Sequence, residues 1–111
     1  MLHGTITRGT TPTIIFPLST EIVPSNLIDF TISCRQKGKT IWTRRKGDFD
    51  EANVSSKAIT IKFSQLDTLS FLPITDTIDI QIKGLTKDEE VIILGRYSYR
   101  LEDVYDEEEM I

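Results

Sequence analysis

Few side chains in this sequence are suited to catalysis or metal binding. It contains a single histidine, His3, and a single cysteine, Cys34. Nucleophilic catalysis requires a base within hydrogen-bond reach of a Ser, Thr or Cys, and the only histidine lies at the very start of the chain, so a His-based dyad is not expected. A zinc site takes about four N or S ligands, more than these two residues supply. The sequence therefore predicts a protein that is not an enzyme and that holds no metal or cofactor.

The carboxylates offer no better site. Asp48, Asp50 and Glu51 lie close together but lack the spacing of a calcium-binding loop, so a solvated loop is the favoured interpretation. Asp76 and Asp79 are an odd number of residues apart, so on one strand they would face opposite sides and could not share a site. No glycine-rich phosphate loop is present either, because Gly9, Gly38, Gly47, Gly84 and Gly95 are each isolated in the sequence.

A cluster of basic residues around a tryptophan is the clearest candidate for a binding surface. Six of the 13 basic residues fall between positions 35 and 46: Arg35, Lys37, Lys39, Arg44, Arg45 and Lys46. Trp42 could stack on a nucleobase or a sugar. It shares its face with Thr40 and Arg44, however, and the favoured interpretation is that it covers the rim of a folded domain while the charges stay in solvent. The remaining aromatic candidates for sugar binding are Tyr97, Tyr99 and Tyr105.

Negative charge gathers at the C-terminal end. Six of the 17 acidic residues lie there: Glu102, Asp103, Asp106, Glu107, Glu108 and Glu109. The rest of the chain has 13 basic and 11 acidic residues, a net charge of +2. The whole chain has a formal net charge of −4, which opposes phosphate binding, so a nucleic-acid partner is not expected. The acidic run is either a solubilising tail or a segment that docks on the basic cluster of a neighbouring subunit, and both interpretations remain open.

Length and composition are those of one globular domain. The chain has 111 residues, of which 39% are hydrophobic and 27% charged. No apolar run approaches the roughly 18 to 20 residues that span a bilayer, and the first residues do not form a signal peptide. We therefore expect a protein that is made in the cytoplasm, stays there or leaves only by lysis, and has no membrane partner. Cys34 cannot form an internal disulfide and is expected to be a buried, inert thiol.

Alternating apolar residues predict about seven short antiparallel strands, over residues 2–8, 13–16, 28–35, 39–46, 59–63, 78–82 and 91–101. Pro12 and Pro17 flank the second of these and predict an edge strand or a bulge. The turn at Lys37-Gly38 predicts a hairpin, residues 47–53 a loop, and Lys83-Gly84 the start of another turn. Gly95 in the last strand suggests a bulge, with Ile93, Tyr97, Tyr99 and Leu101 on one face.

Ser64 and Asp67 form a capping-box pattern that predicts a helical turn over residues 65–71. The expected fold is an all-β immunoglobulin-like sandwich at residues 1–101, followed by an acidic tail at 102–111; a small OB-type barrel is the alternative. The stretch at 64–71 resembles the helical corner before the sixth strand of immunoglobulin-like domains. Phe71 stands where those domains often have a tyrosine, so the hydroxyl bond of a tyrosine corner would be missing.

The segment Arg8-Gly9-Thr10-Thr11-Pro12-Thr13, followed by an apolar strand, resembles a group of small uncharacterised proteins of phages and prophages of Gram-positive bacteria. The turn at 64–68 and the strand with its following turn at 78–86 also match that group, and the likeness covers roughly residues 8–104. This chain departs from the group at Ile14, where a polar residue or histidine is usual, and in its acidic ending.

The resemblance implies a virion component encoded near tail, baseplate or neck genes, with other virion proteins and copies of itself as partners. Its outline is also similar to the N-terminal sandwich domains of phage baseplate proteins. We therefore expect a non-enzymatic structural protein that assembles through strand edges and through the acidic segment docking on the basic cluster. The alternatives are a receptor- or carbohydrate-binding module on the phage surface and an intracellular nucleic-acid-binding accessory protein.

Overall fold

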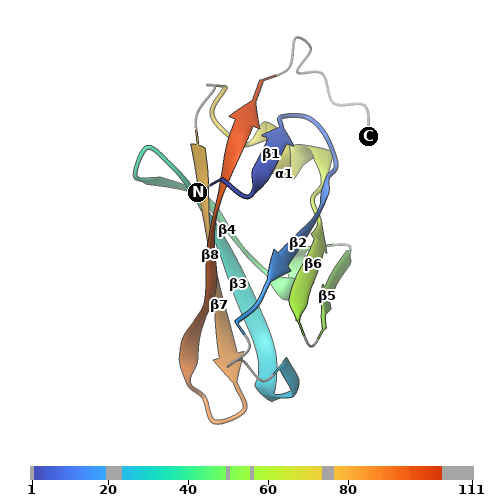
Figure 1. Cartoon of the computed structure of the whole chain (residues 1–111), viewed down its shortest axis with the longest axis vertical. Helices are drawn as coiled ribbons and strands as arrows, with labels where there is room; N and C mark the ends of the chain where they lie inside the picture. Colours follow the sequence, from blue (N-terminus) through green and yellow to red (C-terminus); the bar gives the residue numbers. More distant parts are fainter. Residues whose placement is uncertain (1, 20–23, 50, 56, 74–76, 104–111) are drawn as a thin grey trace.

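The computed structural model describes residues 2–19, 24–49, 51–55, 57–73 and 77–103, which fold as two β-sheets packed face to face (Figure 1). The larger sheet has the order β1-β8-β7-β3-β4 and the smaller one β2-β6-β5. The strands of the larger sheet are β1 Gly4–Thr7, β3 Leu27–Gln36, β4 Lys39–Arg45, β7 Thr77–Thr86 and β8 Val91–Glu102. Those of the smaller sheet are β2 Thr13–Pro17, β5 Glu51–Val54 and β6 Ala58–Lys62.

This strand order confirms the immunoglobulin-like sandwich and excludes a closed barrel. In the letters used for immunoglobulin domains, β2, β5 and β6 correspond to strands B, D and E and form one sheet. In the other sheet, β3, β4, β7 and β8 correspond to strands C, C′, F and G. The described residues contain eight strands rather than about seven, because Glu51–Val54, predicted to be loop, pairs with β6 as strand β5. In addition, β1 runs parallel to β8, whereas the other pairings are antiparallel.

Period-two alternation places the apolar side chains between the sheets, as predicted. Ile32 and Cys34 of β3, Ile59 and Ile61 of β6 and the three inward isoleucines of β7 are almost fully buried. The prediction for Lys83-Gly84 is wrong, because β7 continues through both residues to Thr86. Gly84 serves close packing rather than a turn: a Cβ there would come within 2.8 Å of Leu27 Cδ2.

A β-bulge in β8 decides which of its residues enter the core. Ile82 pairs with Gly95 but Lys83 pairs with Ile93, so Leu94 is the extra residue. The predicted bulge near Gly95 is therefore confirmed. Because the extra residue reverses the alternation, Leu94 is buried while Ile93 is 46% exposed, and the prediction that Ile93 faces the core is wrong. Gly95 leaves room for the Tyr97 ring, with which a Cβ would collide.

The helical corner lies between β6 and β7. Helix α1, Gln65–Leu69, begins with the predicted capping box: the Asp67 amide donates to Ser64 Oγ at 3.1 Å and the Ser64 amide to the Asp67 carboxylate at 2.9 Å. Phe71 is buried and stacks on Trp42, with ring centroids 5.8 Å apart. Two short 3₁₀ turns, η1 Pro24–Asn26 and η2 Lys46–Asp48, complete the described elements.

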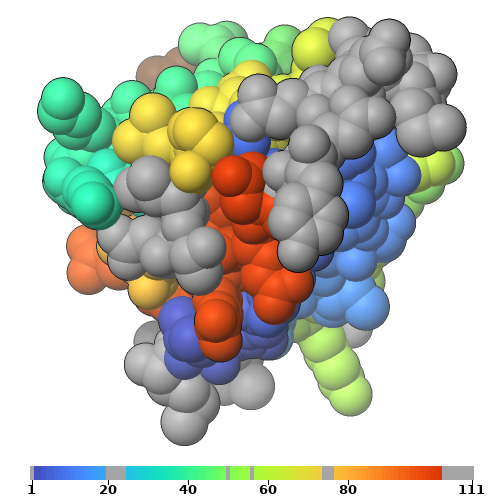
Figure 2. Space-filling model, turned by 90° about the horizontal axis from the view of Figure 1, so that it is seen from above, coloured from blue at the N-terminus to red at the C-terminus, as the bar shows by residue number. Residues whose placement is uncertain are grey.

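Arg8, in the turn between β1 and β2, joins three parts of the chain at one end of the sandwich. Its guanidinium donates to the carbonyl oxygen of Phe71 at 2.9 Å and to that of Leu69 at 3.1 Å, and it contacts Asp103 Oδ1 at 2.7 Å. The side chain is only 6% exposed, and its bond to the Phe71 carbonyl oxygen is buried, so that acceptor depends on it. Figure 2 looks onto this end, where the β1–β2 turn, the α1 corner and the end of β8 come to the surface together.

The sandwich domain extends two residues beyond the predicted end at residue 101. Glu102 is the last residue of β8, and its carbonyl oxygen accepts from the Arg8 amide at 2.9 Å. Asp103 is held by the Arg8 guanidinium. These two acidic residues therefore belong to the sandwich, and the rest of the predicted tail lies outside the described residues.

We predict that Arg8→Lys lowers the free energy of unfolding by about 2 kcal/mol, because an ammonium group cannot reach three acceptors that a planar guanidinium serves together. Urea unfolding followed by circular dichroism measures the change. Arg96→Lys, the same replacement on the exposed face of β8, is the control and should change stability by about 0.5 kcal/mol or less. Equal effects of the two substitutions would contradict the role given to Arg8.

Candidate partner interface

The two residues with the greatest potential for chemistry are kept apart. Cys34 is fully buried in the core, as predicted. Burial raises the pKa of its thiol, the nearby Asp67 carboxylate raises it further, and Arg44 partly opposes the shift. His3 lies at the edge of the larger sheet, where its Nδ1 accepts from the Ser98 amide at 3.2 Å. Among the described residues, no three His, Cys, Asp or Glu side chains are grouped so that they could hold a metal ion.

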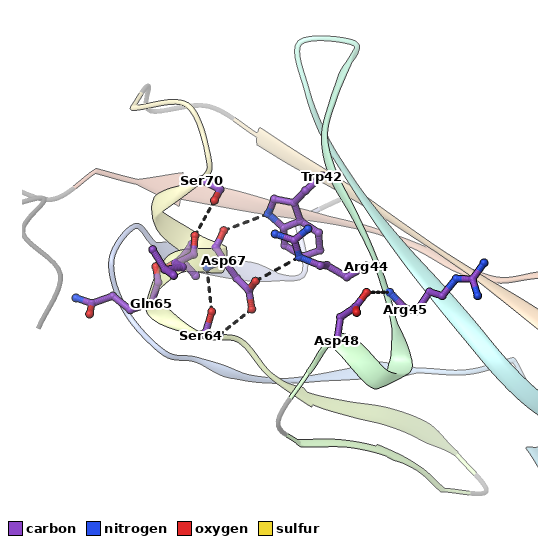
Figure 3. Close-up of polar contacts among 10 residues, drawn as sticks. Trp42, Arg44, Arg45, Asp48, Ser64, Gln65, Asp67 and Ser70 are labelled. Carbon is purple, nitrogen blue, oxygen red and sulfur yellow. Dashed lines mark hydrogen bonds and ion pairs between the residues drawn. The ribbon is translucent and has the colours of Figure 1, made fainter. Parts of the chain in front are cut away.

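Trp42 is part of the core and not a platform for an external ring. A register shift opposite Cys34 and Arg35 makes Ile41 the extra residue of β4, so that Trp42 pairs with Cys34 and faces inward. Its side chain is 6% exposed, and its indole N–H donates to the Asp67 carbonyl oxygen at 3.1 Å (Figure 3). The prediction that Trp42 contacts a partner is therefore wrong, because no partner can stack on a ring packed under the α1 corner.

The basic residues predicted as one surface divide between the two sides of β4. Arg44 lies on the inner side, with its Cζ 5.3 Å from the centre of the Trp42 ring and its Nε 3.7 Å from the Asp67 carboxylate (Figure 3). Arg45 faces the opposite side, opposite Thr31 of β3. Arg44 therefore covers the core on the other side of β4 from Arg45, and its side chain is 40% exposed.

The remaining basic residues are exposed. Lys37 and Gly38 form the predicted turn, both with positive φ, and Lys39 follows it directly. Arg35 donates to the Gly38 carbonyl oxygen at 2.9 Å, which holds its guanidinium beside the hairpin tip. Lys46 begins η2, whose Asp48 carboxylate accepts from the Arg45 amide at 2.8 Å (Figure 3). Asp48 thus caps a turn, as expected of a structural loop residue, while Asp50 lies outside the described residues.

Two of the three tyrosines are also unavailable to a ligand. Tyr97 and Tyr99 are buried between the sheets, and burial raises the pKa of both hydroxyls, that of Tyr99 to about 12. The Tyr97 hydroxyl donates to the Pro17 carbonyl oxygen and so joins β8 to β2. Tyr105 lies outside the described residues. A sugar site built on Trp42 and these two strand tyrosines is therefore excluded by their burial.

The acidic residues fall into two groups. Glu102 is exposed at the end of β8, and Asp103 forms the ion pair with Arg8. Asp106, Glu107, Glu108 and Glu109 lie outside the described residues, so their docking on a basic surface stays a prediction.

The predicted edge strand is confirmed in β2, which pairs with β6 on one side and, within the described part of the chain, with no strand on the other. The Phe63 amide donates to the Pro12 carbonyl oxygen, and the Leu18 amide to that of Lys57. In an antiparallel ladder hydrogen-bonded pairs alternate, so the even-numbered residues of β2 bond to β6 and the amides of Thr13 and Ile15 face the open edge. Ile15 is also 63% exposed.

A polar depression on the outer face of the larger sheet was not foreseen. It has a volume of about 430 Å³ and is lined by His3, Arg35, Asp79, Ile80, Gln81, Arg96, Tyr97 and Ser98. The register brings these residues together: Arg35 pairs with Asp79, which pairs with Ser98, and Gln81 pairs with Arg96. Sequence alternation marks each as outward-facing, but only the strand order makes β3, β7 and β8 neighbours.

The comparisons with known proteins assign no family. No family model and no curated protein matches the chain. Among solved structures, the crystal structure of CopC from Methylosinus trichosporium OB3b is similar, with 11% sequence identity, a TM-score of 0.44, and coverage of 96% of this chain and 89% of that chain. We draw no functional conclusion from a similarity of this size. No helix within the described ranges is long and apolar enough to cross a membrane.

We predict that Cys34 does not react with a disulfide reagent such as Ellman's reagent while the protein is folded. Its thiol is fully buried and its pKa is raised, so the reactive thiolate is absent at neutral pH. One thiol per chain should react after unfolding in urea. Rapid labelling of the folded protein would contradict this prediction.

Proposed function

We propose that this protein is a non-enzymatic structural subunit of a phage virion, made in the host cytoplasm, and that it assembles with copies of itself and with other virion proteins. The open edge of β2 is the observation that carries the assembly part of the proposal. The phage part is supported by the resemblance of the Arg8–Thr13 segment and of the strand and turn segments after it.

The edge of β2 has the properties of a strand-addition site. Its two outward-facing amides, those of Thr13 and Ile15, can donate to an added strand, and natural proteins usually protect such groups from other chains. The flanking residues Pro12 and Pro17 limit the length of the edge. A constant-type immunoglobulin domain has its first strand beside the second at this position. In this chain the first strand, β1, pairs with β8 in the opposite sheet instead.

A second copy of β2 is the occupant that fits this edge best. If two copies pair antiparallel about a twofold axis centred on Ile15, the two Ile15 residues exchange both of their backbone hydrogen bonds. The Thr13 amide of each copy then faces the Pro17 carbonyl of the other, which also accepts from the Tyr97 hydroxyl. Pro17 has no amide to donate back to the Thr13 carbonyl oxygen, so this outer pair makes one bond instead of two. The exposed Ile15 side chains become a cross-strand apolar pair. The result is one continuous sheet across two subunits.

We predict that Ile15→Pro abolishes this self-association and leaves the monomer folded. Proline removes the amide that faces the open edge, whereas the β2–β6 ladder uses the amides of the neighbouring residues. Sedimentation velocity at several protein concentrations measures the association, and circular dichroism checks the fold.

Ile15→Thr is the matched control, because it keeps a β-branched side chain and the amide while removing the apolar pair. It should weaken association much less than Ile15→Pro. If association persists unchanged in a folded Ile15→Pro variant, the strand-addition mechanism is wrong.

The virion assignment predicts that quantitative mass spectrometry of density-purified particles from the source phage or induced prophage finds this protein. Its copy number should match a ring or shell symmetry, because oligomers built from one repeated contact close symmetrically. Absence of the protein from complete particles would overturn the assignment.

A further inference from the structure

We infer that the outer face of the larger sheet binds the acidic C-terminal segment, residues 104–111, of a second copy of this chain. This inference rests on the self-assembly proposed above and names a contact for it that is separate from the β2 edge. The site is the depression between Arg35 and Arg96, with His3 at one side.

The charges in the depression favour an anion. Arg35 and Arg96 reach it from β3 and β8, on either side of β7, and Asp79 is the one carboxylate in its lining. Asp79 accepts a hydrogen bond from the Ser98 hydroxyl at 2.9 Å. Among the described residues, no carboxylate lies within ion-pair distance of the Arg96 guanidinium, so its charge is not neutralised within the domain.

His3 adds a hydrogen-bond donor. Its Nδ1 accepts from the Ser98 amide, so in the neutral ring the proton is on Nε2. The ring is fixed in this orientation by an edge contact with Tyr97, at a centroid distance of 5.4 Å, and by the bond from the His3 amide to the Ser98 carbonyl oxygen. Two guanidinium groups and an imidazole N–H therefore surround one recess, which suits carboxylates.

The surface continues along the strands in a way that matches the rest of the segment. Beyond the depression, Lys83 of β7 and Arg45 of β4 line a second recess of about 220 Å³. Leu85 and Val91 also line this recess, and Val91 is 68% exposed. Asp29 lines it too, and its carboxylate accepts from the Phe30 amide at 2.8 Å. The exposed Ile93 pairs with Lys83. From Asp79 to Leu85 is roughly 20 Å along a strand, about the length of residues 105–111 when extended.

The composition of residues 104–111 is complementary to this surface. Four consecutive acidic residues, 106–109, are followed by Met110 and Ile111. Acidic side chains over Arg35, Arg96 and Lys83 would leave the two apolar ones beside Val91 and Ile93. The sheet face has basic side chains followed by an apolar patch, and the segment has acidic residues followed by two apolar ones, so the two are complementary in the same order.

A second copy is a better donor of this segment than the same chain. Asp103, the residue just before it, is bound to Arg8, and Arg8 also binds the α1 corner. That corner connects the two sheets, whereas the depression lies on the outer face of the larger sheet. The described chain therefore ends beside Arg8 and the α1 corner, and Asp103 is not among the residues that line the depression.

A peptide-binding measurement on the full-length chain tests the inference. The receptor carries D106N, E107Q, E108Q and E109Q, so that its own segment does not compete, and the probe is a fluorescent peptide of residues 104–111. The peptide should bind at low salt, and raising NaCl from about 50 mM to about 300 mM should weaken binding severalfold. A peptide with amides in place of its acidic side chains should not bind.

Receptor variants locate the site. Arg35→Gln with Arg96→Gln should weaken peptide binding by about tenfold or more, because two charge-assisted contacts are lost. Lys37→Gln with Lys39→Gln removes the same charge from the hairpin tip and should change affinity by less than about twofold. No binding, or equal loss in both double variants, would overturn the assignment of the depression.

Zero-length carbodiimide cross-linking decides which copy provides the segment. In an equal mixture of isotopically light and heavy wild-type chains, a carboxylate of residues 106–109 should cross-link to Lys83 of the other isotope as often as to the same isotope. Cross-links confined to one isotope would show that the segment binds its own chain and would overturn the second-copy assignment. Peptide binding tests the docking of residues 104–111, whereas particle composition and the Ile15→Pro variant test the proposed function. Either proposal can therefore fail while the other stands.

Discussion

One buried guanidinium determines how the two sheets are joined. Arg8 fixes the turn where the chain crosses from the larger sheet to the smaller one, and the same group bonds the last carbonyls of the α1 corner and the end of β8. A guanidinium suits this position because its donors point in fixed directions and it stays charged. The Arg-Gly-Thr-Thr-Pro segment therefore has a structural explanation: Gly9 has the positive φ of the turn, and the Thr10 carbonyl accepts from the Thr68 hydroxyl of α1.

The corner replaces the missing tyrosine bond with several others. Phe71 has no hydroxyl, yet its carbonyl is held by Arg8 and its ring stacks on Trp42. The β3–β4 hairpin is tied to the same corner by the Trp42 indole and by Gln36, whose amide group exchanges two hydrogen bonds with the Leu72 backbone. As a result, the residues with most functional promise by type, Trp42, Cys34 and two tyrosines, are used to hold the fold. What is left for partners is backbone at an open strand edge and charge on one sheet face.

The aromatic and thiol side chains hold the fold, and the surface offers an open strand edge and charged residues, which agrees with the assembly role proposed above. The proposed strand addition at β2 would supply directional hydrogen bonds but little sequence specificity, because backbone amides are the same in every chain. An acidic segment on a cationic sheet face supplies the opposite, since charge pattern selects a partner more than it adds affinity. The two contacts lie on different sheets, so one subunit can make both at once and extend an assembly beyond a dimer.

The sequence by itself determined the fold class, most strand positions, the capped helical turn, the hairpin at Lys37-Gly38 and the edge position of β2. These depend on local periodicity and on residues with restricted backbone geometry, which act within a few positions. It could not determine the faces of Trp42 and Ile93, because single-residue bulges in β4 and β8 reverse the alternation and are set by the neighbouring strand. It also could not show that Arg8 is buried or that Arg35, Arg96 and His3 share a recess. The three residues of the recess are 32 or more positions apart, and only the strand order, fixed by packing two sheets around one core, makes them neighbours.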